Sequence, residues 1–133
     1  MVAKPYNNGE WSEARFKSFI KGGLRALTRK WGPKNAVRKA AWRARGVYLC
    51  AGHERRAHRV PLSLPKQQGK GRTNNLFVDH IDPIIDPAVG FTTWDNVIER
   101  MFCEAKNLQV LCKECHDTKT KQEREQRGTK RKV

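Results

Sequence analysis

The fold of this chain is decided by residues 107–120, which read NLQVLCKECHDTKT. The first part, Leu108 to Leu111, is a short run rich in β-forming residues and predicts a strand. Cys112 and Cys115 follow with a two-residue gap, which lets a tight turn direct both sulfurs at one metal ion. A last helix is predicted from near Cys115 into a charged tail. The stretch therefore predicts a strand, half of a metal site and a helix in succession.

The other half of the metal site is expected at Cys50. Cys50-Ala51-Gly52-His53 has the same gap, with histidine as its second ligand type. The two halves predict a closed structural Cys₃His zinc site made of Cys50, His53, Cys112 and Cys115. His58 is also within reach of Cys50 and remains the alternative fourth ligand. Buried cysteines or a redox pair are the competing interpretation, but clustered cysteines in a chain without a visible signal peptide favour metal binding.

A second group of polar residues has the chemistry for phosphodiester hydrolysis. A β-rich run at 76–78 leads into Asp79-His80, Asn107 precedes the next strand, and His116 stands at the start of the last helix. The reaction needs an activated water, which an imidazole can supply, and charge stabilisation, which a divalent cation can supply. Strand neighbours point to opposite faces, so the strand must end or twist at 79–80 to serve one site. Asn107 would fix the loop or orient the His80 ring.

These stretches resemble the motif of the HNH endonuclease family. The matching residues are Val78-Asp79-His80-Ile81-Asp82-Pro83 and the run from Asn107 to Thr120, and the likeness covers about residues 47–122. The chain departs from the family pattern at His53, where a second cysteine is usual. A looser likeness to small HNH proteins of tailed bacteriophages is carried by Trp31-Gly32-Pro33 and by residues 90–94.

The resemblance implies a ββα-metal fold with one catalytic divalent cation, either Mg²⁺, Mn²⁺ or a similar transition metal. It implies His80 as general base, Asp79 and His116 as ligands of that cation, and Asn107 as the positioning residue. Lys119 matches a lysine that is common in the family, and it is expected to contact phosphate.

The charge of the chain favours a polyanionic partner. Its 133 residues carry 28 Lys and Arg against 13 Asp and Glu, a formal net charge of +15, which favours nucleic acid. The basic residues concentrate in 1–46, whereas 77–110 is an acidic island. Lys70 and Arg72, in the polar loop 65–75, are expected to contact DNA. No long apolar run is visible, so we expect no membrane partner and a cytoplasmic location.

Length and hydrophobic spacing predict an α+β protein with a modest core. The helices are predicted at 11–31, at 35–45 and from 92 or 93 to about 104, and Gly32-Pro33 is expected to end the first. Further short strands are predicted at 47–49 and 60–64, joined to the next strand by a loop or hairpin at 65–75. The expected organisation is a basic helical extension at 1–46, an HNH nuclease domain at 47–126 and a basic tail at 127–133.

The sequence thus predicts a metal-dependent endonuclease that nicks or cuts DNA, with phage packaging or replication proteins as candidate partners. The competing hypothesis is a zinc-stapled nucleic-acid-binding protein without catalysis. That hypothesis explains the charge and the cysteines, but it does not explain why Asp79, His80, Asn107 and His116 occur together.

Overall fold

The computed structural model describes residues 2–66 and 68–132, with side chains as far as residue 128. The chain contains helices and three small antiparallel sheets among its described residues, which confirms the expected α+β class. The chain divides into two compact units, Met1–Trp31 and Gly32–Val133. No helix among the described residues is long and apolar enough to cross a bilayer.

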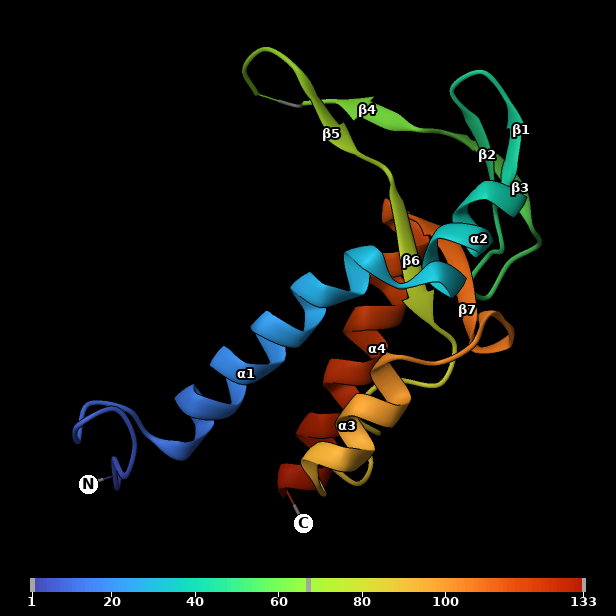
Figure 1. The fold of residues 1–133 in the computed structure, drawn as a ribbon. Helices are drawn as coiled ribbons and strands as arrows, with labels where there is room; N and C mark the ends of the chain where they lie inside the picture. The colour runs from blue at the N-terminus through green and yellow to red at the C-terminus, as the bar shows by residue number, and fades with distance from the viewer. Residues whose placement is uncertain (1, 67, 133) are drawn as a thin grey trace. The chain divides into compact units, whose positions relative to one another are not determined.

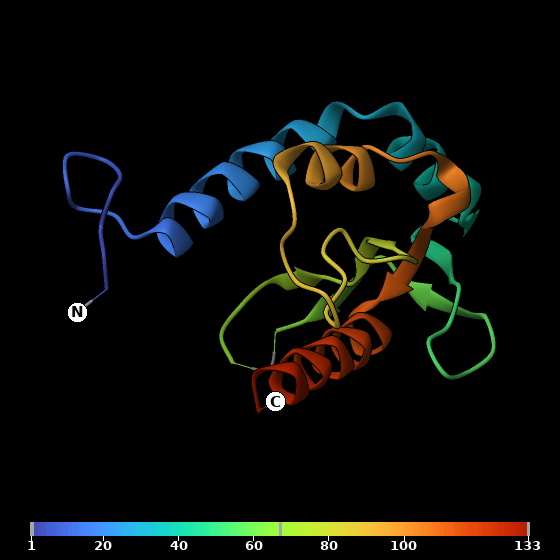
Figure 2. The same cartoon turned by 90° about the horizontal axis from the view of Figure 1, so that it is seen from below.

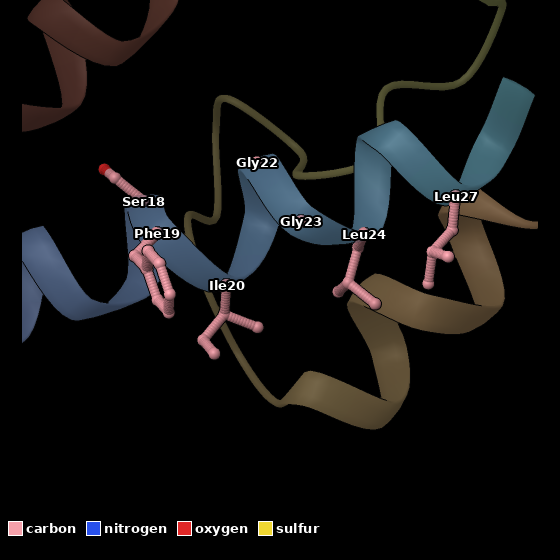
Figure 3. Close-up of a pocket in the computed structure, with 7 residues that line it drawn as sticks. All are labelled: Ser18, Phe19, Ile20, Gly22, Gly23, Leu24 and Leu27. Atoms are coloured by element: carbon pink, nitrogen blue, oxygen red, sulfur yellow. The ribbon is translucent and has the colours of Figure 1, made fainter.

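The N-terminal unit is built around an amphipathic helix. Helix α1 (Glu13–Leu27) begins after Ser12, whose hydroxyl accepts a hydrogen bond from the Arg15 amide. The helix predicted at 11–31 is confirmed, although its last turn is the 3₁₀ helix η1 (Thr28–Lys30). Figure 3 shows the apolar side of α1, an open depression lined by Ser18, Phe19, Ile20, Gly22, Gly23, Leu24 and Leu27.

The second helix starts and ends earlier than predicted. Helix α2 spans Gly32–Ala40, so Gly32-Pro33 opens this helix, because proline has no N–H to lose in a first turn. The prediction of helix at 35–45 is wrong at its end, where Trp42–Ala44 forms strand β1. Arg43 closes the corner between them, since its Nη1 donates to the carbonyls of Ala40 and Trp42, both at 2.9 Å.

The first sheet and a separate hairpin follow α2 (Figure 1). Strand β1 pairs with β2 (Val47–Cys50), and β2 pairs with β3 (His58–Pro61) in a register that places Cys50 opposite His58. Strands β4 (Ser63–Pro65) and β5 (Arg72–Asn74) form their own hairpin. The hairpin option for 65–75 is confirmed, while the strand predicted at 60–64 is divided between β3 and β4.

A two-stranded antiparallel sheet leads directly into the last helix. Strand β6 (Leu76–His80) pairs with β7 (Leu108–Cys112), and Figure 2 shows β7 continuing into α4 (Lys113–Lys132). Between the two strands lie α3 (Trp94–Met101), which starts at the N-cap Thr93, and the 3₁₀ helix η2 (Ala105–Asn107). The predicted strand at 108–111 and the helix after it are confirmed. Residues 127–132 extend α4, and Val133 lies outside the described residues.

The main core cluster of the second unit contains three of the cysteines. The buried residues of this cluster are Ala41, Cys50, Val60, Leu76, Val110, Leu111, Cys112 and Cys115. The Ala51 amide donates to the Val110 carbonyl at 2.8 Å, which ties the end of β2 to β7. Because α2 packs on β7 and Ala41 is buried in this core, residues 32–46 fold with the remainder. The boundary expected after residue 46 therefore falls after Trp31.

Candidate metal centre and candidate catalytic face

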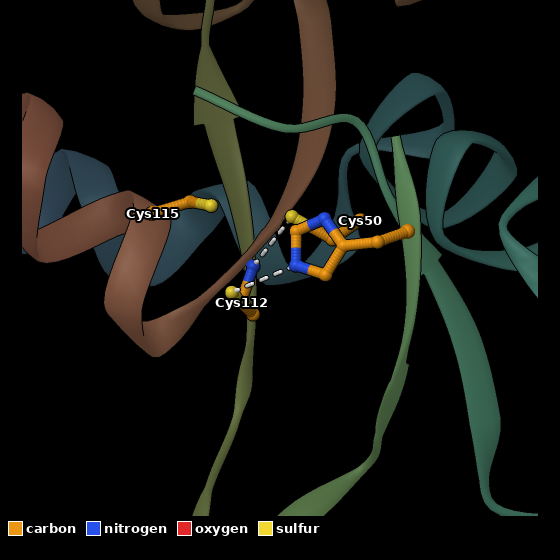
Figure 4. A group of neighbouring side chains, drawn as sticks. Cys50, Cys112 and Cys115 are labelled. Carbon is orange, nitrogen blue, oxygen red and sulfur yellow. Dashed lines mark hydrogen bonds between the residues drawn. The ribbon is translucent and has the colours of Figure 1, made fainter. Parts of the chain in front are cut away.

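Three cysteines and one histidine meet where β2, β3, β7 and α4 converge. Cys50 ends β2, His58 begins β3, Cys112 ends β7 and Cys115 lies in the first turn of α4. Their potential ligand atoms all lie within 4.8 Å of one another, and the three cysteines are buried. Figure 4 shows the three cysteine side chains turned toward one another. This cluster could hold a metal ion.

The backbone around Cys50 favours a thiolate at this position. The amides of Gly52 and Cys112 both point at Cys50 Sγ, at 3.4 and 3.3 Å, and such bonds stabilise negative charge on sulfur. Burial nevertheless raises the pKa of the Cys50 thiol to about 11. A thiolate here therefore needs a cation beside it, which a bound metal would provide.

The His58 ring is oriented as a metal ligand. Its Nδ1 lies 3.1 Å from the Arg56 carbonyl, and a carbonyl can only accept, so Nδ1 carries the proton. In the neutral ring the lone pair is then on Nε2, which lies 3.7 Å from Cys112 Sγ. A backbone carbonyl that fixes the tautomer in this way is the usual support of a ligating histidine.

His53 takes a different role from the one expected. Its Nε2 donates to Gln122 Oε1 at 2.7 Å, and Gln122 in turn donates to Glu54 at 2.7 Å. His53 therefore ties the loop after β2 to α4, and the structure places His58, the alternative ligand, in the cluster. The hairpin register of Cys50 opposite His58 decides between the two histidines, and it is invisible in the Cys-x-x-His spacing.

One face of β6 lies against α4. The Phe77 ring stacks on the His116 ring with centroids 4.6 Å apart, and Asp79 Oδ2 lies 3.0 Å from Lys119 Nζ. Phe77 and Asp79 are two residues apart on a strand, and His116 and Lys119 three apart on a helix, so each pair shares a face. Asp79 and His116 therefore lie on facing surfaces of β6 and α4.

Lys119 is buried in this interface and does not present its charge to solvent. Its side chain is 12% exposed, and Nζ lies 3.0 Å from Asp79, 2.9 Å from Glu123 and 2.8 Å from the His80 carbonyl. Burial lowers the pKa of Lys119, but the hydrogen bonds to Glu123 and Asp79 outweigh burial and raise it above its ordinary value. These three acceptors match its three N–H groups, so the phosphate contact expected for Lys119 stays a prediction that would require one of these bonds to be replaced. Glu123 was missed because it stands outside the motif.

The His80 ring turns toward α3. Its Nε2 lies 2.9 Å from the Met101 carbonyl, so Nε2 carries the proton and the neutral ring has its lone pair on Nδ1. Asp79 Oδ2 also accepts from Gln109, its cross-strand partner, at 3.1 Å. Asp79 and His80 thus have separate sets of partners, as expected for neighbours on a strand.

Asn107 fixes the loop that follows β6. Its Oδ1 accepts from the Asp82 amide at 2.9 Å, and its carbonyl accepts from the Ile81 amide at 2.9 Å. Of the two roles expected for Asn107, loop fixation is the one that these bonds provide, and none of them reaches the His80 ring.

Asp79 and His116 are the two residues expected to hold the catalytic cation. Within residues 2–66 and 68–128, the clusters of three or more metal-ligating side chains do not include Asp79 or His116. These two offer one carboxylate and one imidazole, both of which are donors for a divalent cation. Asp79 makes its bonds to Lys119 and Gln109 through Oδ2, so its Oδ1 is the oxygen outside those bonds.

The expected DNA-contacting residues lie in the β4–β5 hairpin. Lys70 is exposed between the two strands. Arg72 donates from Nε to the Ser63 hydroxyl at 2.7 Å and from Nη2 to the Ser63 carbonyl at 2.8 Å. Arg72 therefore fastens the hairpin, and Lys70 is the more available charge of the two.

Comparisons of this chain with protein-family models, with curated proteins and with solved structures found no match.

Proposed function

We propose that this chain is a metal-dependent endonuclease of the HNH type that hydrolyses DNA phosphodiester bonds. The observation that carries the proposal is the packing of β6 on α4, which puts Asp79 and His116 on facing surfaces with His80 next in the chain. The order of strand, strand and helix around these residues supports it. The net charge of +15 supports a nucleic-acid substrate.

His80 is the proposed general base. The Met101 carbonyl holds the proton on Nε2, so Nδ1 is the nitrogen with a lone pair for a water proton. Anchoring the ring to α3 also fixes its orientation, because the carbonyl belongs to the last residue of that helix. Asn107 supports the site indirectly by holding the loop after His80.

Asp79 and His116 are the proposed ligands of the catalytic cation. A divalent cation held by these two residues would stabilise charge on the phosphate and on the leaving oxygen. Oδ1 of Asp79 and a ring nitrogen of His116 are the donors that the chain offers for it. Lys119 holds the other oxygen of Asp79, so it fixes the direction of that carboxylate.

The Cys50, His58, Cys112 and Cys115 cluster is the proposed structural zinc site. Three sulfurs and one imidazole nitrogen are the donors that zinc prefers, and Mg²⁺ prefers oxygen. These four side chains would supply all the ligands of a tetrahedral zinc ion, which would leave no place for a substrate. It connects β2 and β3 to the β7–α4 unit that carries the candidate catalytic residues.

A plasmid-nicking assay tests the proposal. Wild-type protein should convert supercoiled DNA to nicked or linear forms with added Mg²⁺ or Mn²⁺. His80→Ala should lower the rate by about a hundredfold or more while DNA binding in a gel-shift assay is preserved. His53→Ala is the matched control, since this histidine bonds to Gln122, which has no role in the proposed chemistry, and it should cut like wild type.

The zinc-stapled binding protein remains the second candidate. It is favoured by one observation, the neutralisation of Asp79 by Lys119 within hydrogen-bonding distance. If wild type and His80→Ala bind DNA equally and neither nicks it with any divalent cation supplied, the binding protein replaces the nuclease.

A further inference from the structure

Trp42 is an exposed aromatic side chain on the edge strand β1. It is 54% exposed, whereas the other aromatic residues described in 32–128 are half-buried. Large aromatic side chains on a surface are enriched where another molecule binds. The exposure of Trp42 therefore favours a binding site for a partner with a flat, apolar face.

Trp42 has an aromatic residue as its cross-strand partner, and that residue in turn carries a guanidinium over its ring. Trp42 is paired in register with Tyr48, so the two side chains project from the same face of the sheet. Tyr48 packs against the core, which anchors this face. The Arg38 guanidinium lies 5.9 Å from the centroid of the Tyr48 ring. Trp42 therefore shares its face of the sheet with an anchored tyrosine that has an arginine over its ring.

The charged side chains around Trp42 in the sequence, counting Lys, Arg, Asp and Glu, are all basic. Residues 32–53 contain no Asp or Glu, and their basic members are Lys34, Arg38, Lys39, Arg43 and Arg45. Lys39 and Arg45 are exposed. A positive surface around an aromatic ring is complementary to a nucleic acid, because phosphates meet the charges while a base meets the ring.

We propose that Trp42, with Arg38 and Tyr48 beside it, stacks on an unpaired base, so that this protein recognises DNA containing single-stranded nucleotides. In a duplex each base face is covered by its neighbours, so only an unpaired base can present a face to Trp42. The binding step stands by itself, and its link to cleavage rests on the proposed nuclease function. The preferred substrate is then gapped or branched DNA.

Anisotropy titrations test the binding step. A labelled oligothymidylate and a fully paired duplex of equal length are titrated with full-length protein without added divalent cation. Trp42→Ala should weaken binding of the single strand by about tenfold and leave duplex binding within about twofold. Trp42→Phe should recover most of the loss, and Ile98→Ala, which shortens another exposed apolar side chain, should behave like wild type in both titrations.

Three results would overturn the stacking site. They are equal weakening of single strand and duplex in Trp42→Ala, no recovery in Trp42→Phe, and a wild-type protein that does not bind the single strand. Far-ultraviolet circular dichroism establishes that each variant is folded.

Cleavage of gapped and fully paired duplexes then tests the substrate class. Wild type should prefer the gapped DNA, and Trp42→Ala should lose that preference while still nicking supercoiled plasmid. A nuclease that ignores the gap overturns the substrate assignment and leaves the nuclease proposal intact. A protein that cuts neither DNA overturns the proposed nuclease function, and the anisotropy titrations then still test whether Trp42 stacks on an unpaired base.

Discussion

The ammonium group of Lys119 connects several groups of the candidate catalytic face. Its ammonium lies between the carboxylates of Asp79 and Glu123, whose side chains are 13% and 26% exposed. Removing one partner of a buried ion pair is expensive, because the remaining charge loses its counterion without regaining water. At position 119 the loss would leave two carboxylates facing each other. The same ammonium also holds the His80 carbonyl, so the Asp79-His80 backbone depends on it.

We predict that Lys119→Met lowers the free energy of unfolding by about 3 kcal/mol, measured by urea denaturation at neutral pH. Lys113→Met is the matched control on the same helix, since Lys113 pairs with Asp117 at the surface, where both side chains are about half exposed. Its effect should be below about 1 kcal/mol. Equal effects at the two positions would show that the Lys119 network contributes no more than a surface pair.

The difference in unfolding free energy between wild type and Lys119→Met should depend on pH in one direction. Because the pKa of Lys119 is raised in the folded protein above its ordinary value of 10.5, its stabilisation is complete below that pH and is lost as the pH rises through the raised pKa. The gap between wild type and Lys119→Met should therefore stay constant near neutrality and narrow above pH 10.5. A gap that already narrows near neutrality would contradict the assignment.

At the level of elements, the β2–β3 hairpin decides what the metal centre contains. Its register places His58 opposite Cys50, whereas His53, in the loop between the two strands, bonds to α4. We predict that His58→Ala lowers the zinc content or zinc affinity of the purified protein by at least about tenfold, as measured by competition with a chromogenic chelator. His53→Ala should bind zinc like wild type. Loss of zinc in the His53 variant alone would reverse the ligand assignment.

The same hairpin depends on one glycine. Gly52 has a φ of +85°, and a Cβ atom there would lie 2.3 Å from the Arg55 carbonyl oxygen. Gly46 has a φ of +71° with nothing within 4 Å. We predict that Gly46→Ala costs about 1 kcal/mol of strain and that Gly52→Ala costs more and also weakens zinc binding, because the turn must open. Equal unfolding free energies for the two variants would rule out the steric account.

At the scale of the whole molecule, the features that could be predicted from the sequence are those that depend on residues close together in the chain. The strand at 108–111, the helix after it and the two-residue gap between Cys112 and Cys115 are set by short-range patterns. The choice of His58 and the burial of Lys119 are set by contacts between distant segments. A spacing rule cannot distinguish His53 from His58, because the bend that brings one of them back is made by strand pairing.

The cysteine cluster also determines how stability is distributed over the second unit. Three of the eight buried residues in the core cluster around this site are the cysteines 50, 112 and 115, so an ion there would replace the apolar contacts that a larger core would supply. Metal binding at such a site is coupled to folding.

We therefore predict that chelation lowers the melting temperature of the protein by more than about 10 °C, as measured by near-ultraviolet circular dichroism. Zn²⁺ should restore the signal and Mg²⁺ should not. Cys103→Ser, outside the cluster, should respond like wild type, whereas a metal-depleted protein that melts unchanged would mean that the four side chains hold the fold together without an ion.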